Sequence, residues 1–278
     1  MIRIEMMGTN GAGKSTLLRA MMAHRINGED FPSWHTEKEL RRLLVQRYWA
    51  HKPGLLAKGK GILCHVPKVG KLWTDSWAVR LGRQAYLECR GEEAEFFHHC
   101  MRLVSEGSLG SKGHVELNWL FQALKELCWM RRWDGAVVIE ESLAHELAGL
   151  LASAGLVTRA REAFHSMPRP DAVIHVGASE EVVWRRLMDR EREVGRPLIR
   201  HRGLGLKARR ELIRRSIAAE EMGASMLAWR GVPVLHIDGE VACQEVVGEV
   251  GRFVDDITSS CRTLEADTAL VGGTGRRV

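Results

Sequence analysis

The residues from Gly8 to Ser15 have the types and the spacing of a phosphate-binding loop. The segment Gly-Thr-Asn-Gly-Ala-Gly-Lys-Ser matches the pattern G-x-x-x-x-G-K-[ST]. In such a loop the glycines allow backbone N–H groups to face phosphates, Lys14 would reach the β- and γ-phosphates, and Ser15 would ligate Mg²⁺. A strand pattern precedes the loop and a helical pattern follows it, which disfavours the alternative of a merely flexible turn. The residues predicted to bind ATP are Gly8, Asn10, Gly11, Ala12, Gly13, Lys14, Ser15 and Thr16.

A second group that could do chemistry consists of two adjacent acids, Glu140 and Glu141. They follow the apolar run from Ala136 to Ile139, whose length suits a buried parallel strand. Open α/β sheets bind ligands at the carboxyl ends of their strands. We therefore predict that Glu140 holds Mg²⁺ together with Ser15 and that Glu141 accepts the proton of an attacking hydroxyl, with the order of these two roles left open. The alternative is that both acids only begin the next helix, where negative charge is favourable.

The third group is basic. Residues 185–215 contain eleven arginines and one lysine against four acids, a net charge of +8 in a chain whose total is +6. Arginines at this density beside Gly203 and Gly205 suit a lid over residues 185–206 that neutralises ATP phosphates and excludes water. Arg186 and Arg190 share a helix face and are predicted to act in catalysis, along with Lys14 and Glu141. The alternative is a solvated helix surface with salt bridges, because acids interleave with the arginines.

The elements that must position these groups alternate between strand and helix. Strand patterns cover residues 2–7, 136–139, 172–176 and 232–237, and helical patterns cover residues 14–25, 143–154, 180–193, 207–229 and 243–257. This order predicts an α/β fold of the P-loop NTPase class with a doubly wound parallel sheet. The predicted kinase domain spans residues 1–257. From Thr258 the Ser-, Thr- and Gly-rich sequence predicts a disordered tail over 258–278.

Residues 29–133 predict a large helical insertion that forms the acceptor site. Helical periodicity appears around residues 36–50, 74–105 and 114–132, and residues 52–71 read as a loop in which 62–66 could form a short strand. Arg80, Arg83 and Arg90 are predicted anion contacts. Trp73 and Trp77 could stack a base, although tryptophans at this helical spacing are more often part of a core.

Composition sets the remaining expectations. The longest apolar stretch, from Ala148 to Val157, covers about half of the roughly 20 residues that cross a bilayer, and no signal-peptide pattern follows Met1. We therefore expect a cytoplasmic protein with no membrane partner, and we leave its oligomeric state open. The six cysteines are scattered, which predicts reduced thiols. One short segment contains four possible zinc ligands, but its helical pattern and the lack of zinc-finger spacing disfavour a zinc site. The four residues of that segment are Cys89, His98, His99 and Cys100.

Four blocks of this sequence resemble the nucleoside and nucleotide kinase-like group of P-loop proteins. They are the phosphate loop, residues 139–143 (Ile-Glu-Glu-Ser-Leu), residues 169–176 (Arg-Pro-Asp-Ala-Val-Ile-His-Val) and residues 231–238 (Gly-Val-Pro-Val-Leu-His-Ile-Asp). Their order is that of strands 1, 3, 4 and 5 in that group. The resemblance implies an ATP-dependent kinase whose arginine lid follows the third block.

The strand predicted over residues 136–139 corresponds to strand 3 of that group. It is not followed by the Asp-Arg-Tyr or Glu-Arg-Ser triplet of thymidylate and deoxynucleoside kinases. Its Glu-Glu-Ser-Leu element and the Phe-His-Ser-Met-Pro segment at 164–168 look more like P-loop kinases that include phage enzymes phosphorylating 5-hydroxymethyluridine within DNA. That resemblance implies a hydroxymethyl group on a DNA base as acceptor, held by phosphate contacts and stacking, and the host cytoplasm as location if the protein is viral.

The function predicted is therefore transfer of the γ-phosphoryl group of ATP to a nucleoside-type acceptor, leaning toward 5-hydroxymethyluridine in DNA. A free nucleoside, a nucleotide or another small hydroxyl metabolite is the alternative acceptor. A P-loop ATPase or GTPase switch is the alternative of another class, and the chain shows no Asn-Lys-x-Asp guanine-reading element. An inactive nucleotide-binding module is disfavoured because Lys14, Ser15, Glu140 and Glu141 are all present.

Overall fold

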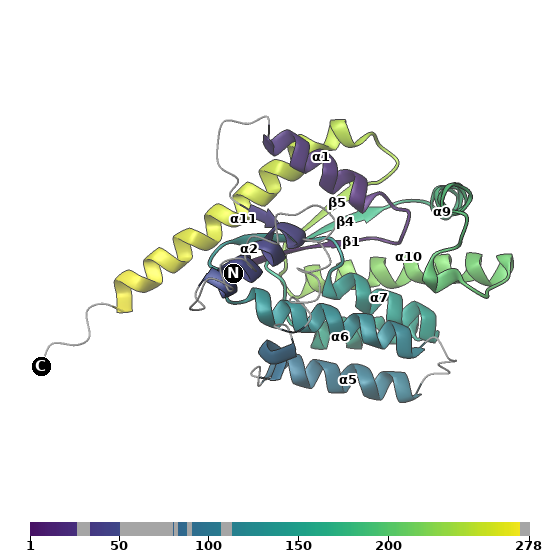
Figure 1. The fold of residues 1–278 in the computed structure, drawn as a ribbon, viewed down its shortest axis with the longest axis horizontal. Helices are drawn as coiled ribbons and strands as arrows, with labels where there is room; N and C mark the ends of the chain where they lie inside the picture. Colours follow the sequence, from purple (N-terminus) through teal and green to yellow (C-terminus); the bar gives the residue numbers. More distant parts are fainter. Residues whose placement is uncertain (27–33, 51–79, 81–82, 88–90, 107–112, 273–278) are drawn as a thin grey trace, which may run out of the picture.

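The structure is a computed structural model, and it describes residues 1–26, 34–50, 80, 83–87, 91–106 and 113–272. Its centre is a parallel sheet with the strand order β2-β3-β1-β4-β5 (Figure 1). The strands are β1 (Ile2–Met7), β2 (Trp34–Thr36), β3 (Ala136–Ile139), β4 (Ala172–Gly177) and β5 (Val234–Asp238). Every residue of β1 and β3 is buried, as expected for strands covered on both faces. The predicted doubly wound α/β fold is confirmed.

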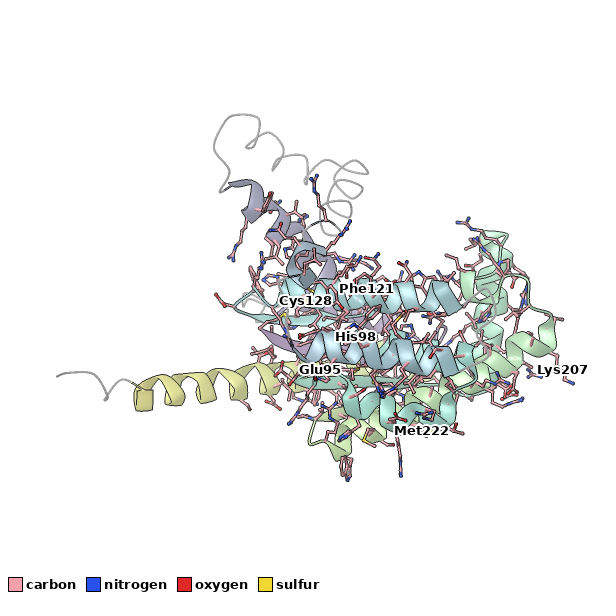
Figure 2. The ribbon with its side chains drawn as sticks, turned by 90° about the horizontal axis from the view of Figure 1, so that it is seen from below. Glu95, His98, Phe121, Cys128, Lys207 and Met222 are labelled. Carbon is pink, nitrogen blue, oxygen red and sulfur yellow. The ribbon has the colours of Figure 1, made fainter. Side chains whose placement is uncertain are left out.

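Helices cover both faces of the sheet. One face carries α1 (Lys14–Ile26) and α11 (Cys243–Gly272), which pack on alternate β1 residues Ile2, Ile4 and Met6. The opposite face carries α7 (Leu143–Ala154) and α10 (Leu206–Trp229), with α8 (Ala160–Ser166) beside them. Outside α7 lie α6 (Gly113–Met130) and α5 (Glu92–Glu106), which run side by side (Figure 1, Figure 2).

Two further helices flank the sheet near its ends. The helix α2 (Glu37–Ala50) packs on β2 and β3 through Leu40 and Val45. The helix α9 (Glu180–Val194) follows β4, and the 3₁₀ turn η3 (Ile199–His201) links it to α10, while another 3₁₀ turn, η2 (Val157–Arg159), precedes α8. No helix in the described part of the chain is long and apolar enough to span a membrane.

Two parts of the predicted organisation differ from the structure. The range 29–133 was expected to contain helices, yet β2 lies within it and pairs with β3 at the edge of the sheet. Three residues are too few for an alternating pattern to be recognised in the sequence. The helix α8 was also missed, because its seven residues complete only about two turns of helical periodicity.

The last helix is longer than the sequence pattern predicts. The last helix was expected to end at Ile257 and a disordered tail to follow, but α11 continues to Gly272. Residues 258–270 contain neither proline nor glycine, and their leucines and alanines favour a helix, so nothing in this stretch stops α11. In Figure 1 the end of α11 extends away from the sheet and its covering helices.

Several predicted features lie outside the described residues. They are Trp73, Trp77, Arg90, Cys89 and the loop over residues 52–71. Arg80 and Arg83 are described, and both are exposed. His98 and His99 lie on α5 with Cys100, which is buried in the core between α5, α6 and α7. Within the described ranges there is no group of three or more His, Cys, Asp or Glu side chains that could hold a metal ion.

Candidate active site

The phosphate loop connects β1 to α1 in a conformation that requires glycine. Gly8 has φ 138°, and a Cβ atom at this position would stand 2.3 Å from the carbonyl oxygen of Val176 on the neighbouring strand β4. Gly11 and Gly13 also have positive φ values. The loop residues line an open pocket of about 1260 Å³, together with α9 and the segment after β5. The loop residues in its wall are Thr9, Asn10, Gly11, Gly13, Lys14, Ser15 and Thr16.

Two residues predicted to bind ATP do not line this pocket. Ala12 is buried in the core beneath the loop, and Gly8 lies at its start. Gly8 contributes through its backbone, because its carbonyl oxygen accepts a hydrogen bond from Lys14 Nζ. The side chain of Lys14 is buried, and this burial lowers the pKa of its ammonium group, while Glu220 acts in the opposite direction.

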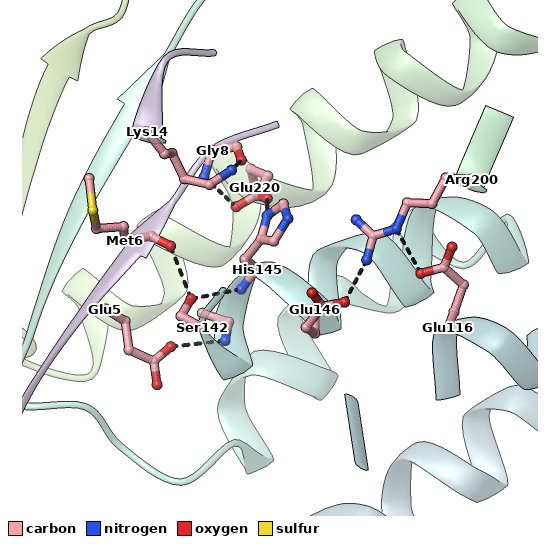
Figure 3. A network of polar contacts seen from close by, with 11 residues as sticks. Glu5, Met6, Gly8, Lys14, Glu116, Ser142, His145, Glu146, Arg200 and Glu220 are labelled. Carbon is pink, nitrogen blue, oxygen red and sulfur yellow. Dashed lines mark hydrogen bonds and ion pairs between the residues drawn. The ribbon is translucent and has the colours of Figure 1, made fainter. Parts of the chain in front are cut away.

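Glu220 is a residue of the site that the sequence did not reveal. It lies on α10, and its Oε2 accepts a hydrogen bond from Gly8 N at 3.0 Å (Figure 3). Its Oε1 is 2.8 Å from Nδ1 of His145, on the first turn of α7. Glu220 and Gly8 are separated by 212 positions along the chain, and no motif connects them. A glutamate within a long helix carries no sequence signal of such a contact.

The two acids after β3 lie beside the loop. Ser15 Oγ donates a hydrogen bond to Glu140 Oε1, and Lys38 Nζ is 3.5 Å from Glu140 Oε2. The structure thus brings together the two residues predicted to bind Mg²⁺. The hydroxyl and carboxylate oxygens fit a Mg²⁺ ion, which is commonly held by few protein oxygens along with substrate phosphates.

Glu141 is exposed and lines the same pocket as the phosphate loop. Ser142 caps α7: its Oγ accepts a hydrogen bond from His145 N at 3.1 Å and donates one to Met6 O at 3.0 Å. Because the cap follows both acids, Glu140 and Glu141 precede the helix and are not part of its first turn. The structure therefore does not support the alternative that these two acids only begin α7.

A second pocket of about 330 Å³ adjoins the first. It is enclosed by α2, α6, the first turn of α7 and the η3 turn. The two pockets share four wall residues: Asn10, Glu141, His145 and Leu198. A molecule in the second pocket would therefore lie directly beside the phosphate loop.

Ion pairs across this second pocket connect its walls. Arg41 on α2 donates hydrogen bonds to Glu37, at 2.9 Å, and to Glu126 of α6. Burial raises the pKa of Glu37 to about 7, against the opposing effect of Arg41. On the other side, Arg200 of η3 lies between two glutamates: its Nε is 2.9 Å from Glu116 Oε2, and its terminal nitrogen donates to Glu146 (Figure 3).

An aromatic ring completes this wall. The guanidinium group of Arg200 lies over the ring of Trp119, 4.9 Å from its centroid, which is within cation–π range. Gln122, on the same helix, also faces the pocket, and its Oε1 has no hydrogen-bond partner among the described residues. None of Trp119, Gln122 or Arg41 was predicted, because their spacing along α2 and α6 matches no motif.

The predicted arginine lid is divided between different roles. Arg186 donates hydrogen bonds to the carbonyl oxygens of Gly11 (3.2 Å), Ala12 (2.9 Å) and Gly239 (2.8 Å). It thus ties the phosphate loop to the segment after β5. Arg190 is exposed and lines the first pocket.

Five other arginines of residues 185–215 form salt bridges, and of these only Arg192 lies within the predicted lid over 185–206. Their acidic partners lie on α9 and α10. The pairs are Arg192 with Asp189, Arg209 with Glu191, Arg210 with Glu180 and Glu181, Arg214 with Glu180 and Glu211, and Arg215 with Glu211.

The sheet, the phosphate loop and the flanking helices match the fold of a solved nucleoside kinase structure. A solved structure of deoxyadenosine kinase from M. mycoides, with the products dCMP and a flexible dCDP bound, aligns with 92% of this chain and 100% of its own, with a TM-score of 0.50 and 11% sequence identity. A structure of the same enzyme with bound dATP aligns with 91% of this chain and 100% of its own, with a TM-score of 0.45 and 12% identity. At these identities the likeness concerns the fold. No family model and no curated protein matches the sequence.

Proposed function

We propose that this protein is an ATP-dependent kinase that phosphorylates a hydroxyl group of a nucleoside-type acceptor. The proposal is based on the observation that two pockets adjoin each other. One is lined by the phosphate loop, the other is a smaller pocket of about 330 Å³, and both are bordered by Glu141 and Asn10. A donor and an acceptor bound in these pockets would meet at the acids after β3.

On the donor side, the loop N–H groups and Lys14 bind the phosphates of ATP. Arg190, at the rim, adds positive charge, and Arg186 holds the loop in shape through three backbone carbonyls. Ser15 and Glu140 are the residues that would hold Mg²⁺, which neutralises charge on the β- and γ-phosphates when it is bound. The segment 239–244 after β5 borders the remainder of the nucleotide.

The transfer itself needs one proton acceptor. The acceptor hydroxyl oxygen attacks the γ-phosphorus, the bond from this phosphorus to the bridging oxygen of ADP breaks, and ADP leaves with that electron pair. Glu141, which faces both pockets, takes the hydroxyl proton. Its exposure leaves the carboxyl group accessible to an acceptor that enters the second pocket.

The acceptor pocket favours an uncharged group. Its two arginines, Arg41 and Arg200, each contact two glutamates, so their charge is already compensated. A free phosphate on the acceptor would find no uncompensated cation among the described wall residues. Trp119 offers an aromatic face and Gln122 an amide, two groups that suit a nucleobase. These features favour a nucleoside over a nucleotide.

The alternative acceptor is a hydroxymethyl group on a DNA base. Arg196 and Arg202, on either side of η3, are exposed, as contacts with DNA phosphates would require. A base would then have to leave the duplex and enter the pocket. A magnesium-dependent transfer to DNA would fall steeply with added salt, because phosphate contacts release counterions.

One screen tests both classes of acceptor. Labelled ATP is incubated with the protein and nucleosides, nucleoside monophosphates, or 5-hydroxymethyluridine-containing DNA. We expect label to be transferred to a nucleoside. Salt-sensitive transfer to DNA alone would establish DNA as the acceptor. ADP formation that is independent of every acceptor would favour an ATPase switch and contradict the kinase.

A further inference from the structure

His145 occupies the boundary between the two pockets. Its side chain lines both of them, although the residue is only 5% exposed. The Ser142 cap fixes the first turn of α7 and thereby the position of His145, which follows the two acids closely in sequence. A small exposed fraction at such a boundary means that little more than an edge of the imidazole ring reaches the pockets.

The inner edge of the ring is held by Glu220. Nδ1 lies 2.8 Å from Glu220 Oε1, while Glu220 Oε2 receives the hydrogen of Gly8 N (Figure 3). Among the described residues, Glu220 is the hydrogen-bond partner of the imidazole through Nδ1, and none of them bonds to Nε2. Glu220 therefore connects the phosphate loop and His145 through one carboxyl group.

The environment keeps the imidazole neutral. Burial lowers the pKa of His145 well below its usual value, and the charges of Lys14 and Arg200 lower it further. Burial also raises the pKa of Glu220 to about 7. When the carboxyl holds a proton on Oε1, it donates to Nδ1, and Nε2 then carries the hydrogen of the ring.

We propose that His145 is a catalytic residue that donates a hydrogen bond from Nε2 to the phosphoryl group during its transfer, and that Glu220 is the residue that positions it. The inference rests on the proposed kinase function. The transferring phosphoryl group passes from the first pocket toward the second, and His145 is a wall residue of both. A donor fixed at this boundary stabilises negative charge on the transferred oxygens without having to reorient.

Two substitutions of His145 separate this role from a structural one. The amide of His145→Asn occupies the place of Nδ1 and can still bind Glu220, but it cannot reach the pocket. The amide of His145→Gln extends to the place of Nε2. His165→Asn, at an exposed histidine on α8, is the control.

The measurement is the affinity for ADP with and without aluminium fluoride, which imitates the transferring phosphoryl group and requires no acceptor. For His145→Asn we expect unchanged affinity for ADP alone and a loss of about 100-fold for the fluoride complex. His145→Gln should recover part of that loss, and His165→Asn should bind both like the unmodified protein. Thermal unfolding verifies that each variant is folded.

The outcomes distinguish the inference from the function on which it rests. Normal ADP binding with undiminished fluoride affinity in His145→Asn overturns the role of His145 alone. A loss of fluoride affinity in His145→Gln but not in His145→Asn would make the histidine a brace for Glu220, which also overturns it. If the unmodified protein fails to bind ADP, the proposed kinase function falls and the inference falls with it.

Variants of Glu220 test the positioning. In Glu220→Gln the amide oxygen can accept from Gly8 N, so the NH₂ group must face Nδ1 and donate to it, which leaves the hydrogen on Nε2. We expect this variant to keep the fluoride affinity within about threefold, whereas Glu220→Ala loses tenfold or more. A Glu220→Gln variant as impaired as Glu220→Ala would contradict the donor role of Nε2.

Discussion

The donor and acceptor sides of the site are built in opposite ways. The donor side consists largely of consecutive residues, Gly8 to Thr16, and uses backbone N–H groups together with one lysine and one serine. The acceptor side joins α2, α6, α7 and η3, and charged side chains from each are neutralised across the pocket. The first arrangement can be encoded by a short motif, while the second depends on contacts between distant segments.

The two sides should therefore respond differently to substitution. A missing donor at the phosphate loop removes an interaction that is strongest during phosphoryl transfer. A missing charge in the acceptor wall leaves its partners uncompensated and alters stability and acceptor binding. Substitutions on each side of the site test this difference.

The largest effect is expected for Lys14→Ala. The ammonium group is the only side-chain cation that the loop itself, Gly8 to Ser15, contributes, so its loss should lower kcat by about 1000-fold. Steady-state turnover and circular dichroism are the measurements, with Lys207→Ala at the exposed start of α10 as the control. Lys207 lies at the end of α10 far from the projecting end of α11 (Figure 2). Turnover near that of the control would remove the phosphate loop from the mechanism.

Glu141→Gln should lower kcat by about 100- to 1000-fold while ATP affinity stays within about twofold. The expected fall in kcat without a change in ATP affinity follows because the base acts on the acceptor hydroxyl and not on ATP. Glu140→Gln should instead weaken the affinity for Mg²⁺, because it alters a carboxylate beside Ser15. If the kcat profile belongs to Glu140→Gln and the Mg²⁺ profile to Glu141→Gln, the two roles are reversed.

Glu37 should make stability depend on pH. Burial raises its pKa in the folded protein to about 7 from an ordinary value of 4.5, so the folded state is disfavoured once the carboxyl loses its proton. The stabilisation is complete below pH 4.5 and is lost as pH rises through 7, with a total change of about 3 kcal/mol. Glu37→Gln lacks this titration.

Denaturant unfolding of both proteins at about pH 5 and pH 8 isolates the contribution of Glu37, because the other carboxyl groups titrate in both. The free energy of unfolding should fall more in the unmodified protein than in Glu37→Gln. An equal fall in both would mean that Arg41 compensates the buried carboxylate fully.

Glu116→Gln is expected to have the smallest effect, and on the acceptor side alone. Arg200 would keep Glu146 but lose one ion pair, so η3 should be held less firmly against α6. We expect KM for the acceptor to rise about tenfold, which corresponds to about 1.4 kcal/mol, with KM for ATP unchanged. Glu211→Gln, at a surface pair on α10, is the matched control. A rise in KM for ATP would contradict the separation of the two sides.

The same contrast explains what could be predicted from the sequence. The loop, the acids after β3 and the principal strands depend on neighbouring residues, so their patterns are visible in the sequence. Glu220 and Arg200 act through partners that only the fold brings near. Glu220 belongs to no motif, and the arginine-rich segment that contains Arg200 does not indicate its glutamate partners. Arg186 was predicted to act in catalysis and lines the nucleotide pocket, but its three carbonyl partners depend on how α9 packs against the loop.

The bonds of Arg186 have a kinetic consequence. The guanidinium group fixes the carbonyls of Gly11 and Ala12 before any nucleotide arrives, and it fixes Gly239 as well. Much of the entropic cost of ordering the loop is then met during folding, and ATP binding need not supply it. Nucleotide association should accordingly be a single fast step limited by encounter, and Arg186→Ala should add a slow phase in which the loop must first find its shape.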